Sequence, residues 1–200
     1  MHIDQQNFIN RFYGLDHFNN KKVLEVGSQD INGNNNHLYQ RCDVLRIDLG
    51  PGNNVDLVCN GADLDRPDET YDTIISTEAF EHDARFDETL KNIVRLLKPG
   101  GLFLFTCAAG GRHEHGTHGT DAGSSPHTLD FYQNRSEEEV RTIIDVDEVF
   151  VSHEFVDTVV DLYFWGIKAG GKTDSLESFI PISSGGTIPV SDYRGKAKDE

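Results

Sequence analysis

The apolar residues of this chain gather in short runs that are bounded by turn residues. Runs at 22–26, 44–49, 55–59, 71–76 and 102–107 have the length and apolar character of strands covered on both faces. Segments 4–18 and 86–97 instead repeat their apolar residues at helical spacing, and shorter helices are expected at 37–41 and 136–145. This alternation of strands and helices predicts an α/β fold with a mainly parallel sheet.

The last part of the pattern differs from the rest. Residues 148–155 and 158–168 predict two strands joined by a short turn, and after Gly170 the chain becomes polar and rich in Gly and Ser. The chain length of 200 residues predicts one domain at 1–170, followed by a polar tail at 171–200. Within the domain, residues 1–20 are expected either to pack on the sheet or to cover a ligand site.

The first two predicted strands end in residues suited to a ligand. Glu25 interrupts an apolar run, where a carboxylate is costly unless it is paired. Gly27 permits a sharp turn and the close approach of a ligand. Asp48 closes the next strand 21 residues later, the spacing at which a carboxylate accepts hydrogen bonds from ribose hydroxyls in nucleotide-binding sheets. These positions predict a nucleotide site.

Two further features make this pattern more specific. They are the strand Tyr71–Ser76 and the sequence Leu97-Lys98-Pro99-Gly100-Gly101, which ends a helix and enters a strand. With Glu25-x-Gly27 and Asp48 in the same order, the chain resembles class I S-adenosylmethionine-dependent methyltransferases, in particular the small type 11 group, over residues 20–167. The first loop departs from that group's pattern, because residues 28–30 stand where alternate glycines are usual.

The resemblance implies a Rossmann-like seven-stranded sheet, mostly parallel with an antiparallel strand 7, and helices on both faces. It implies S-adenosyl-L-methionine as cofactor, with S-adenosyl-L-homocysteine as product. The cofactor-binding residues it suggests are Glu25, Gly27 and Ser28 at the methionine end, Asp48 and Leu49 at the ribose, Asp63 and Leu64 at the adenine, and Thr77 and Glu78 along the cleft. Asp63 fits a helix cap or turn equally well.

A methyl acceptor must lose a proton, so a general base is sought among the histidines. His82 lies between two acids just past a strand end, where flanking carboxylates are expected to raise its pKa. The same acids would also suit the start of a helix. His113 and His115 lie in a Gly-rich insertion at 108–128 that leaves a central strand and is expected to contact substrate. His82, His113 and His115 are therefore the catalytic candidates.

The spacing of His113, His115 and His118 also suggests a metal site. These residues lack the i, i+4 spacing of a helical zinc pair, and no Cys lies nearby. We therefore predict no bound metal and leave substrate contact and solvated loop histidines as the two alternatives.

The amino-acid composition narrows the classes of binding partner that we expect. A net charge of −16 argues against nucleic acid and against an anionic membrane surface. Three widely spaced cysteines predict reduced thiols, as in the cytoplasm. The expected partner is a small-molecule acceptor, such as a sugar or secondary metabolite, methylated on oxygen or nitrogen, and a homodimer is the oligomer considered. The alternatives are a non-catalytic cofactor-binding scaffold or partner subunit and, less favoured without Gly-x-Gly-x-x-Gly, an NAD-dependent dehydrogenase.

Overall fold

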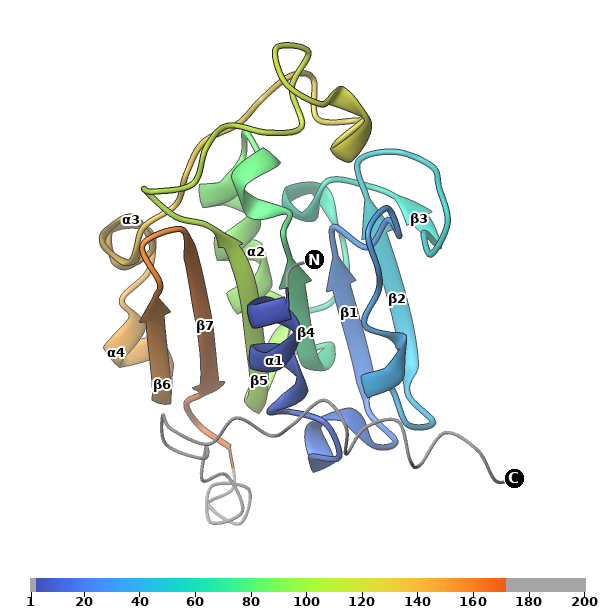
Figure 1. Ribbon diagram of the computed structural model, residues 1–200. Helices are drawn as coiled ribbons and strands as arrows, with labels where there is room; N and C mark the ends of the chain where they lie inside the picture. The colour runs from blue at the N-terminus through green and yellow to red at the C-terminus, as the bar shows by residue number, and fades with distance from the viewer. Residues whose placement is uncertain (1–2, 172–200) are drawn as a thin grey trace.

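The computed structural model describes residues 3–171 and contains one seven-stranded sheet in the order β3-β2-β1-β4-β5-β7-β6 (Figure 1). The strands are β1 Lys22–Val26, β2 Asp43–Asp48, β3 Leu57–Val58, β4 Tyr71–Thr77, β5 Leu97–Ala108, β6 Phe150–Asp157 and β7 Asp161–Lys168. The pairs among β1 to β5 are parallel, and β7 is antiparallel to both of its neighbours. The predicted mostly parallel sheet with an antiparallel strand 7 is confirmed.

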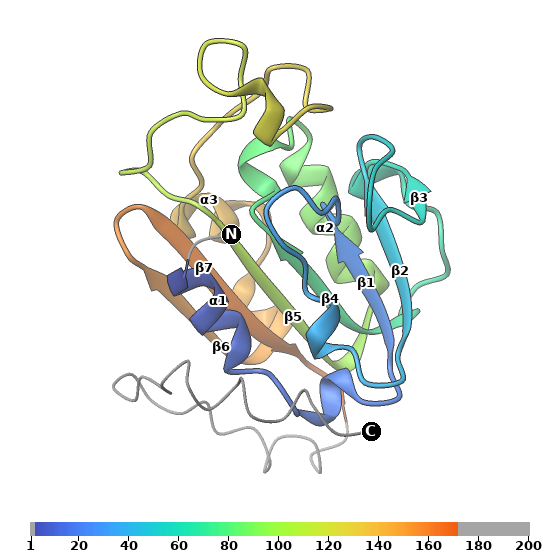
Figure 2. The ribbon, with the colours of Figure 1, turned by 45° about the vertical axis from the view of Figure 1, so that its right-hand side comes forward.

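Helices cover both faces of the sheet, as predicted (Figures 1 and 2). Helix α1, Ile3–Asn10, lies on one face, whereas α2 Phe86–Leu96, α3 Glu137–Ile143 and α4 Val146–Val149 lie on the other. Short 3-10 turns complete the framework: η1 Asp16–Phe18, η2 Asn36–Leu38, η3 Gly61–Asp63, η4 Phe80–His82 and η5 Ala122–Ser124.

Two hydrophobic cores lie on either side of the sheet, because side chains alternate between the faces of a strand. In β5, Leu102 and Leu104 pack in the core under α1, whereas Phe103 and Phe105 pack in the core under α2 to α4. All four side chains are fully buried. This explains why residues 102–105 of β5 are all apolar and why the strand lies near the centre of the sheet.

Several predicted element limits are corrected by the structure. The helix expected at 4–18 ends at Asn10, and Gly14 then adopts a left-handed φ of +79° that an α-helix cannot contain. The helix expected at 37–41 is the 3-10 turn η2. Strand β5 begins at Leu97, five residues before the predicted start at 102, because Leu97 already pairs with Tyr71.

The end of the domain also differs in detail. The predicted capping residue Ser136 accepts a hydrogen bond from the Glu139 amide through its hydroxyl oxygen, but α3 ends at Ile143. A second short helix, α4, follows it, so that β6 starts at Phe150 rather than at 148. The predicted tail at 171–200 lies outside the described residues except for Gly171. Across the part of the chain that is described, no helix has both the length and the apolarity needed to cross a bilayer.

Parallel pairing brings the carboxyl ends of β1, β2 and β4 to the same edge of the sheet, at the top of Figure 1. The loops that leave these ends meet there, and the segment from β5 to α3, residues 109–136, arches above them. Ligands of open α/β sheets bind at this edge. The fold therefore places the predicted strand-end residues and the histidine-bearing insertion on the same side of the molecule.

Candidate functional site

A cleft at this edge contains about 970 Å³ of empty space, including solvent at its mouth. Its walls come from the ends of β1, β2, β3 and β4 and from residues 124–128 of the insertion. The predicted site residues that line it are Glu25, Gly27, Ser28, Asp48, Leu49, Thr77, Glu78 and His82. Residues distant in sequence thus form one concave surface, the usual form of a small-ligand site.

The inner wall carries a buried carboxylate. Glu25 is 2% exposed, and its Oε1 accepts a hydrogen bond of 2.8 Å from the Asn35 amide. The same amide donates to the Thr77 hydroxyl at 3.1 Å, which links β1 to β4. The Arg46 guanidinium lies 3.9 Å from Glu25 Oε2. Burial nevertheless raises the pKa of Glu25 above its ordinary value, because desolvation outweighs these favourable contacts.

The turn after β1 requires glycine for two reasons. Gly27 has a φ of +73°, a conformation that other residues adopt only with strain. A Cβ at this position would also lie 2.1 Å from the Cβ of Ala79, which follows β4. The amides of Gly27 and Ser28 both donate to the Ile47 carbonyl, at 2.9 and 3.1 Å, so the turn is tied to β2. The loops that follow β1 and β4 are therefore packed so closely that no side chain fits between their backbones at Gly27.

Asp48 is fixed at the end of β2 by backbone donors. Its Oδ2 accepts a hydrogen bond from the Gln29 amide at 3.0 Å, and its Oδ1 accepts a longer one from the Gly50 amide at 3.5 Å. A Cβ at Gly50 would lie 2.0 Å from the His127 ring, so the insertion packs directly on the backbone beside this carboxylate. Asp48 is thus held in one orientation next to the cleft.

The two residues predicted to contact the adenine, Asp63 and Leu64, lie outside the cleft. Asp63 is directed to the surface, where its Oδ2 accepts a 2.7 Å hydrogen bond from Arg85, and Leu64 is buried in the core. Neither lines the cleft. The wall at this end is formed by Cys59, Asn60 and Gly61 instead. Their position directly after β3 is the signal that could have identified them, since ligands meet the carboxyl ends of strands.

Asn60 belongs to a small polar network that sequence analysis missed. Its side-chain amide donates to Asp83 at 3.2 Å, while its carbonyl oxygen accepts from the Ala62 amide at 2.8 Å. The other oxygen of Asp83 accepts a 2.5 Å hydrogen bond from the Thr89 hydroxyl on α2. The network fixes the conformation of the chain at Asn60 and Gly61, two residues that line the cleft.

The opposite side of the site contains a cluster of buried ionisable groups. Arg112 donates a 2.5 Å hydrogen bond to Asp161 and lies 3.8 Å from Glu78 Oε2. Glu81 is 0% exposed, and burial together with repulsion from Glu78 raises its pKa well above the ordinary value. Glu78 itself has a left-handed φ of +54°. Strained backbone and perturbed carboxyls are both typical of functional sites.

His82 lies on the wall of the cleft and is 5% exposed. Burial, reinforced by the nearby His115, lowers its pKa to about 4. The expectation that flanking acids raise this pKa is wrong. The physical reason is that Asp83 is engaged with Asn60 and Thr89, while desolvation disfavours the charged imidazole. His82 is therefore neutral near pH 7.

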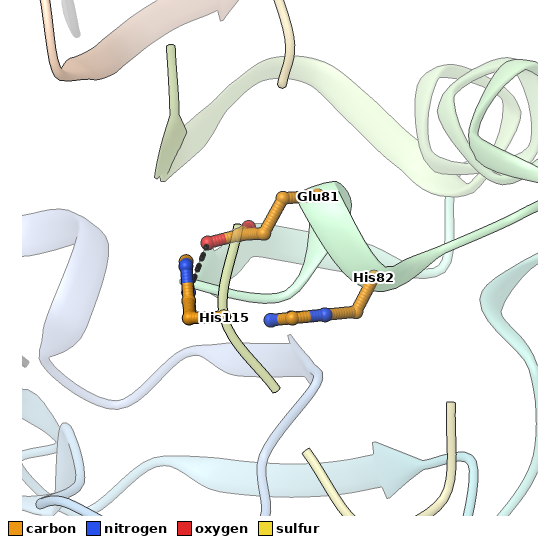
Figure 3. A group of neighbouring side chains, drawn as sticks. All are labelled: Glu81, His82 and His115. Atoms are coloured by element: carbon orange, nitrogen blue, oxygen red, sulfur yellow. Dashed lines mark ion pairs between the residues drawn. The ribbon is translucent and has the colours of Figure 1, made fainter. Parts of the chain in front are cut away.

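The insertion histidines are separated by the fold. His115 lies against His82, with ring centroids 5.1 Å apart, and its Nε2 is 3.9 Å from Glu81 Oε1 (Figure 3). His118 pairs with Asp130 at 3.1 Å and is largely exposed. His113 is exposed, and its carbonyl accepts hydrogen bonds from His115 and from another residue of the loop. Neither His113 nor His115 lines the cleft itself.

The turn η4, which carries Glu81 and His82, is held by the segment that follows the insertion and leads to α3. The Gln133 amide donates to the Glu81 carbonyl at 2.8 Å. Arg135, only 3% exposed, donates to the carbonyls of Phe80 and Asp83 at 2.9 and 2.6 Å. Nothing in the sequence pattern marked Arg135, because a charged residue after a polar loop normally suggests a solvated surface.

A family model for type 11 methyltransferases, described as a methyltransferase domain, matches residues 5–105. The chain belongs to this methyltransferase family. A fatty-acid O-methyltransferase from Mycolicibacterium smegmatis is 41% identical over 46 residues, which are 23% of this chain and only 17% of that enzyme.

Solved structures support the same fold. A 1,6-didemethyltoxoflavin N1-methyltransferase from Burkholderia thailandensis, solved with that molecule and S-adenosylhomocysteine, superposes with a TM-score of 0.56 at 16% identity, covering 84% of this chain and 77% of that one. Phosphoethanolamine N-methyltransferase 2 from Haemonchus contortus, with S-adenosylhomocysteine, gives 0.59 at 15% identity, covering 82% and 52%. At such identities the likeness is one of class I methyltransferase fold.

Proposed function

We propose that this protein transfers a methyl group from S-adenosyl-L-methionine to an oxygen or nitrogen of a small-molecule acceptor. The observation that carries the proposal is the oriented Asp48 carboxylate beside the Gly27 turn, within a cleft of a chain that belongs to a methyltransferase family. A dehydrogenase is not favoured by that family membership.

The described residues fit the proposed cofactor. Gly27 lines the cleft and has no side chain, so its backbone can come close to a ligand. The fixed carboxylate of Asp48 can accept hydrogen bonds from a ribose diol. Asn60 and Gly61 line the end of the cleft at which an adenine is expected, and this supports them over Asp63 and Leu64, which lie outside it.

When bound, the cofactor supplies a methyl group on a sulfonium that is already a good leaving group. The protein then has to align the acceptor and exclude water. Residues 124–128 cover the Asp48 side of the cleft, and Glu78 supplies a partly buried acidic side chain near the other side. Because His82 is neutral near pH 7 and lines the cleft, it is a suitable proton acceptor in our proposal.

The cofactor part of the proposal is tested by replacing Asp48 with alanine. Loss of a charge-assisted interaction with a diol should cost about 1.5–3 kcal/mol, a roughly ten- to hundredfold weaker Kd. Isothermal titration with S-adenosylhomocysteine measures this. The matched control is Asp63→Ala, which removes a carboxylate outside the cleft and is expected to leave the Kd within about twofold. Unchanged binding by Asp48→Ala would exclude it from the site.

The catalytic part needs a separate measurement. Incubation with methyl-labelled cofactor and a library of hydroxyl, carboxyl and amine compounds should label at least one acceptor. Wild-type protein that binds S-adenosylhomocysteine yet labels none of these acceptor classes would favour the scaffold alternative.

A further inference from the structure

We propose that Glu81, His82 and His115 bind one divalent transition-metal ion at the side of the cleft. One ligand atom from each of these residues lies within 4.8 Å of the others, although they come from η4 and from a loop 33 residues later. Figure 3 shows the two imidazoles and the carboxylate converging on one small volume.

The hydrogen bonds of the two imidazoles determine which ring nitrogen of each could bind a metal ion. His82 Nδ1 lies 3.3 Å from the Phe131 carbonyl, and His115 Nδ1 lies 3.2 Å from the His113 carbonyl. A carbonyl oxygen can only accept, so each Nδ1 carries the proton and each Nε2 keeps its lone pair. Histidine ligands of metals commonly donate their other ring N–H in this way. Both residues therefore have the orientation and tautomer of ligands.

The carboxylate provides an independent observation. Glu81 is fully buried, and neither of its oxygens meets a donor in good hydrogen-bond geometry among the described residues, although the backbone amides of Glu81 and Ala108 lie near them. Such a group is costly in a folded protein, because burial removes its water without replacing it. The nearby cation Arg112 is engaged with Asp161. A metal ion beside Glu81 Oε1 would supply the missing positive partner.

The donor set indicates the class of ion. Two imidazoles and one carboxylate suit Zn²⁺, Co²⁺ or Fe²⁺ better than Ca²⁺ or Mg²⁺, and they leave at least one position open. Bonds of about 2.0–2.1 Å in a tetrahedral site require ligand atoms roughly 3.3 Å apart. Glu81 and His82 are held in place by Gln133 and Arg135, whereas His115 lies on a loop next to Gly116, so His115 is the ligand that would move inward.

Sequence spacing could not reveal this set. The pattern His113-x-His115-x-x-His118 directs attention to neighbours within the loop, but His118 is engaged with Asp130 and His113 is exposed. The partners of His115 instead come from the turn after β4. The prediction of no bound metal rests on the spacing of the histidines within the loop, which does not include the residues of η4.

The position of the ion would favour an oxygen acceptor, a consequence that rests on the proposed function. His82 also lines the cleft, so the open coordination position is next to the acceptor space. A hydroxyl bound there would lose its proton to water, since coordination lowers its pKa, and His82 with its Nε2 on the ion would then be a ligand and not the proton acceptor. Its oxygen would then form the new C–O bond as the S–C bond breaks, with that electron pair remaining on sulfur.

The metal site is tested with tag-free full-length protein, stripped by a chelator and titrated with Co²⁺. We expect one ion per chain, with visible absorption bands of a Co²⁺ site containing nitrogen ligands. Glu81→Gln and His115→Ala should each weaken binding at least tenfold. The matched control is His118→Ala, which removes an exposed histidine from the same loop and should leave binding unchanged. His115→Cys should restore binding, because a thiolate is also a ligand.

Titration with S-adenosylhomocysteine separates this proposal from the proposed function. Wild-type protein that binds the nucleoside but takes up neither Co²⁺ nor Zn²⁺ would overturn the metal site alone. Metal uptake that is equal in wild type, Glu81→Gln and His115→Ala would overturn it as well. Metal uptake without nucleoside binding would support the site and refute the methyltransferase proposal.

Discussion

The carboxylates on the two sides of the cleft differ in their hydrogen-bond donors. On the β1–β2 side, Asp48 accepts hydrogen bonds from two backbone amides and Glu25 accepts one from Asn35. On the β4–β5 side, Glu81 has no well-aligned hydrogen-bond donor among the described residues, with only the backbone amides of Glu81 and Ala108 near its oxygens. The first side is organised before any ligand arrives, as a binding surface should be. The second side keeps carboxyls whose pKa burial raises, a pattern typical of catalytic sites.

The largest effect is expected for Gly27→Ala, which tests how rigidly the β1 side is organised. Left-handed backbone costs about 1–3 kcal/mol for alanine, and the clash with Ala79 adds roughly 1–3 kcal/mol. Urea unfolding should therefore show a loss of about 2–6 kcal/mol.

The matched control for that change is Gly14→Ala. Gly14 has a φ of +79°, close to the +73° of Gly27, but a Cβ there meets nothing within 4 Å. The Gly14→Ala variant should therefore lose only the part of the free energy of unfolding that the left-handed backbone costs alanine, without the part due to a steric clash. Equal losses at the two positions would mean that the turn after β1 tolerates a side chain.

A smaller effect is expected for Arg112→Met on the other side. Arg112 is the cation beside Asp161 and Glu78, and its side chain is 18% exposed. Removing one partner of a buried pair costs about 3–5 kcal/mol, and partial exposure favours the lower end. Chemical unfolding should show a loss of about 3 kcal/mol, whereas Arg141→Met, in an exposed pair, should lose less than about 1 kcal/mol. Similar losses in the two variants would contradict the buried cluster.

The smallest effect concerns pH and Glu25→Gln. Burial raises the pKa of Glu25, so the folded state keeps this proton to higher pH than the unfolded state. The stability contributed by the protonated form is present below the ordinary pKa of 4.5 and is lost as pH rises through the folded value. The glutamine variant lacks this loss, so its stability relative to wild type should increase from pH 4.5 to pH 8 in urea titrations.

The opposite sign is expected for Glu88→Gln. Arg85 hydrogen-bonds to Glu88 and lowers the pKa of this exposed carboxyl. Wild type therefore gains stability as pH rises through the lowered folded pKa towards the ordinary value of 4.5, and the variant should fall behind it over that acidic range and not above it. If both variants changed in the same direction, burial would not explain the behaviour of Glu25.

Sequence alone predicted the sheet well because strand signals are local. Apolar runs such as Val23–Val26 and Leu102–Cys107 report burial on both faces, and residues just past the strands report the ligand edge. Element ends were predicted less well. The helix at the N-terminus was extended past Gly14, whose left-handed backbone is not apparent from apolar spacing.

The candidate site was predictable only where it follows strand ends. Asp48 and Gly27 could be placed by the spacing rule, and the structure brings both to the cleft. Asn35, Asn60 and Asp83 could not, because their roles depend on contacts between loops that are far apart in sequence. The assignments to individual ligand atoms, and the roles of His113 and His115 in catalysis, stay predictions.

Both ends of the long segment between β5 and α3 are fixed. Arg112 attaches its beginning to β7 through Asp161, and Arg135 attaches its end to the turn η4. Between these anchors, residues 117–130 contribute little to either hydrophobic core. Substitutions there are therefore expected to leave the folding of the sheet undisturbed. Because residues 124–128 line the cleft, such substitutions would change the shape of its wall alone.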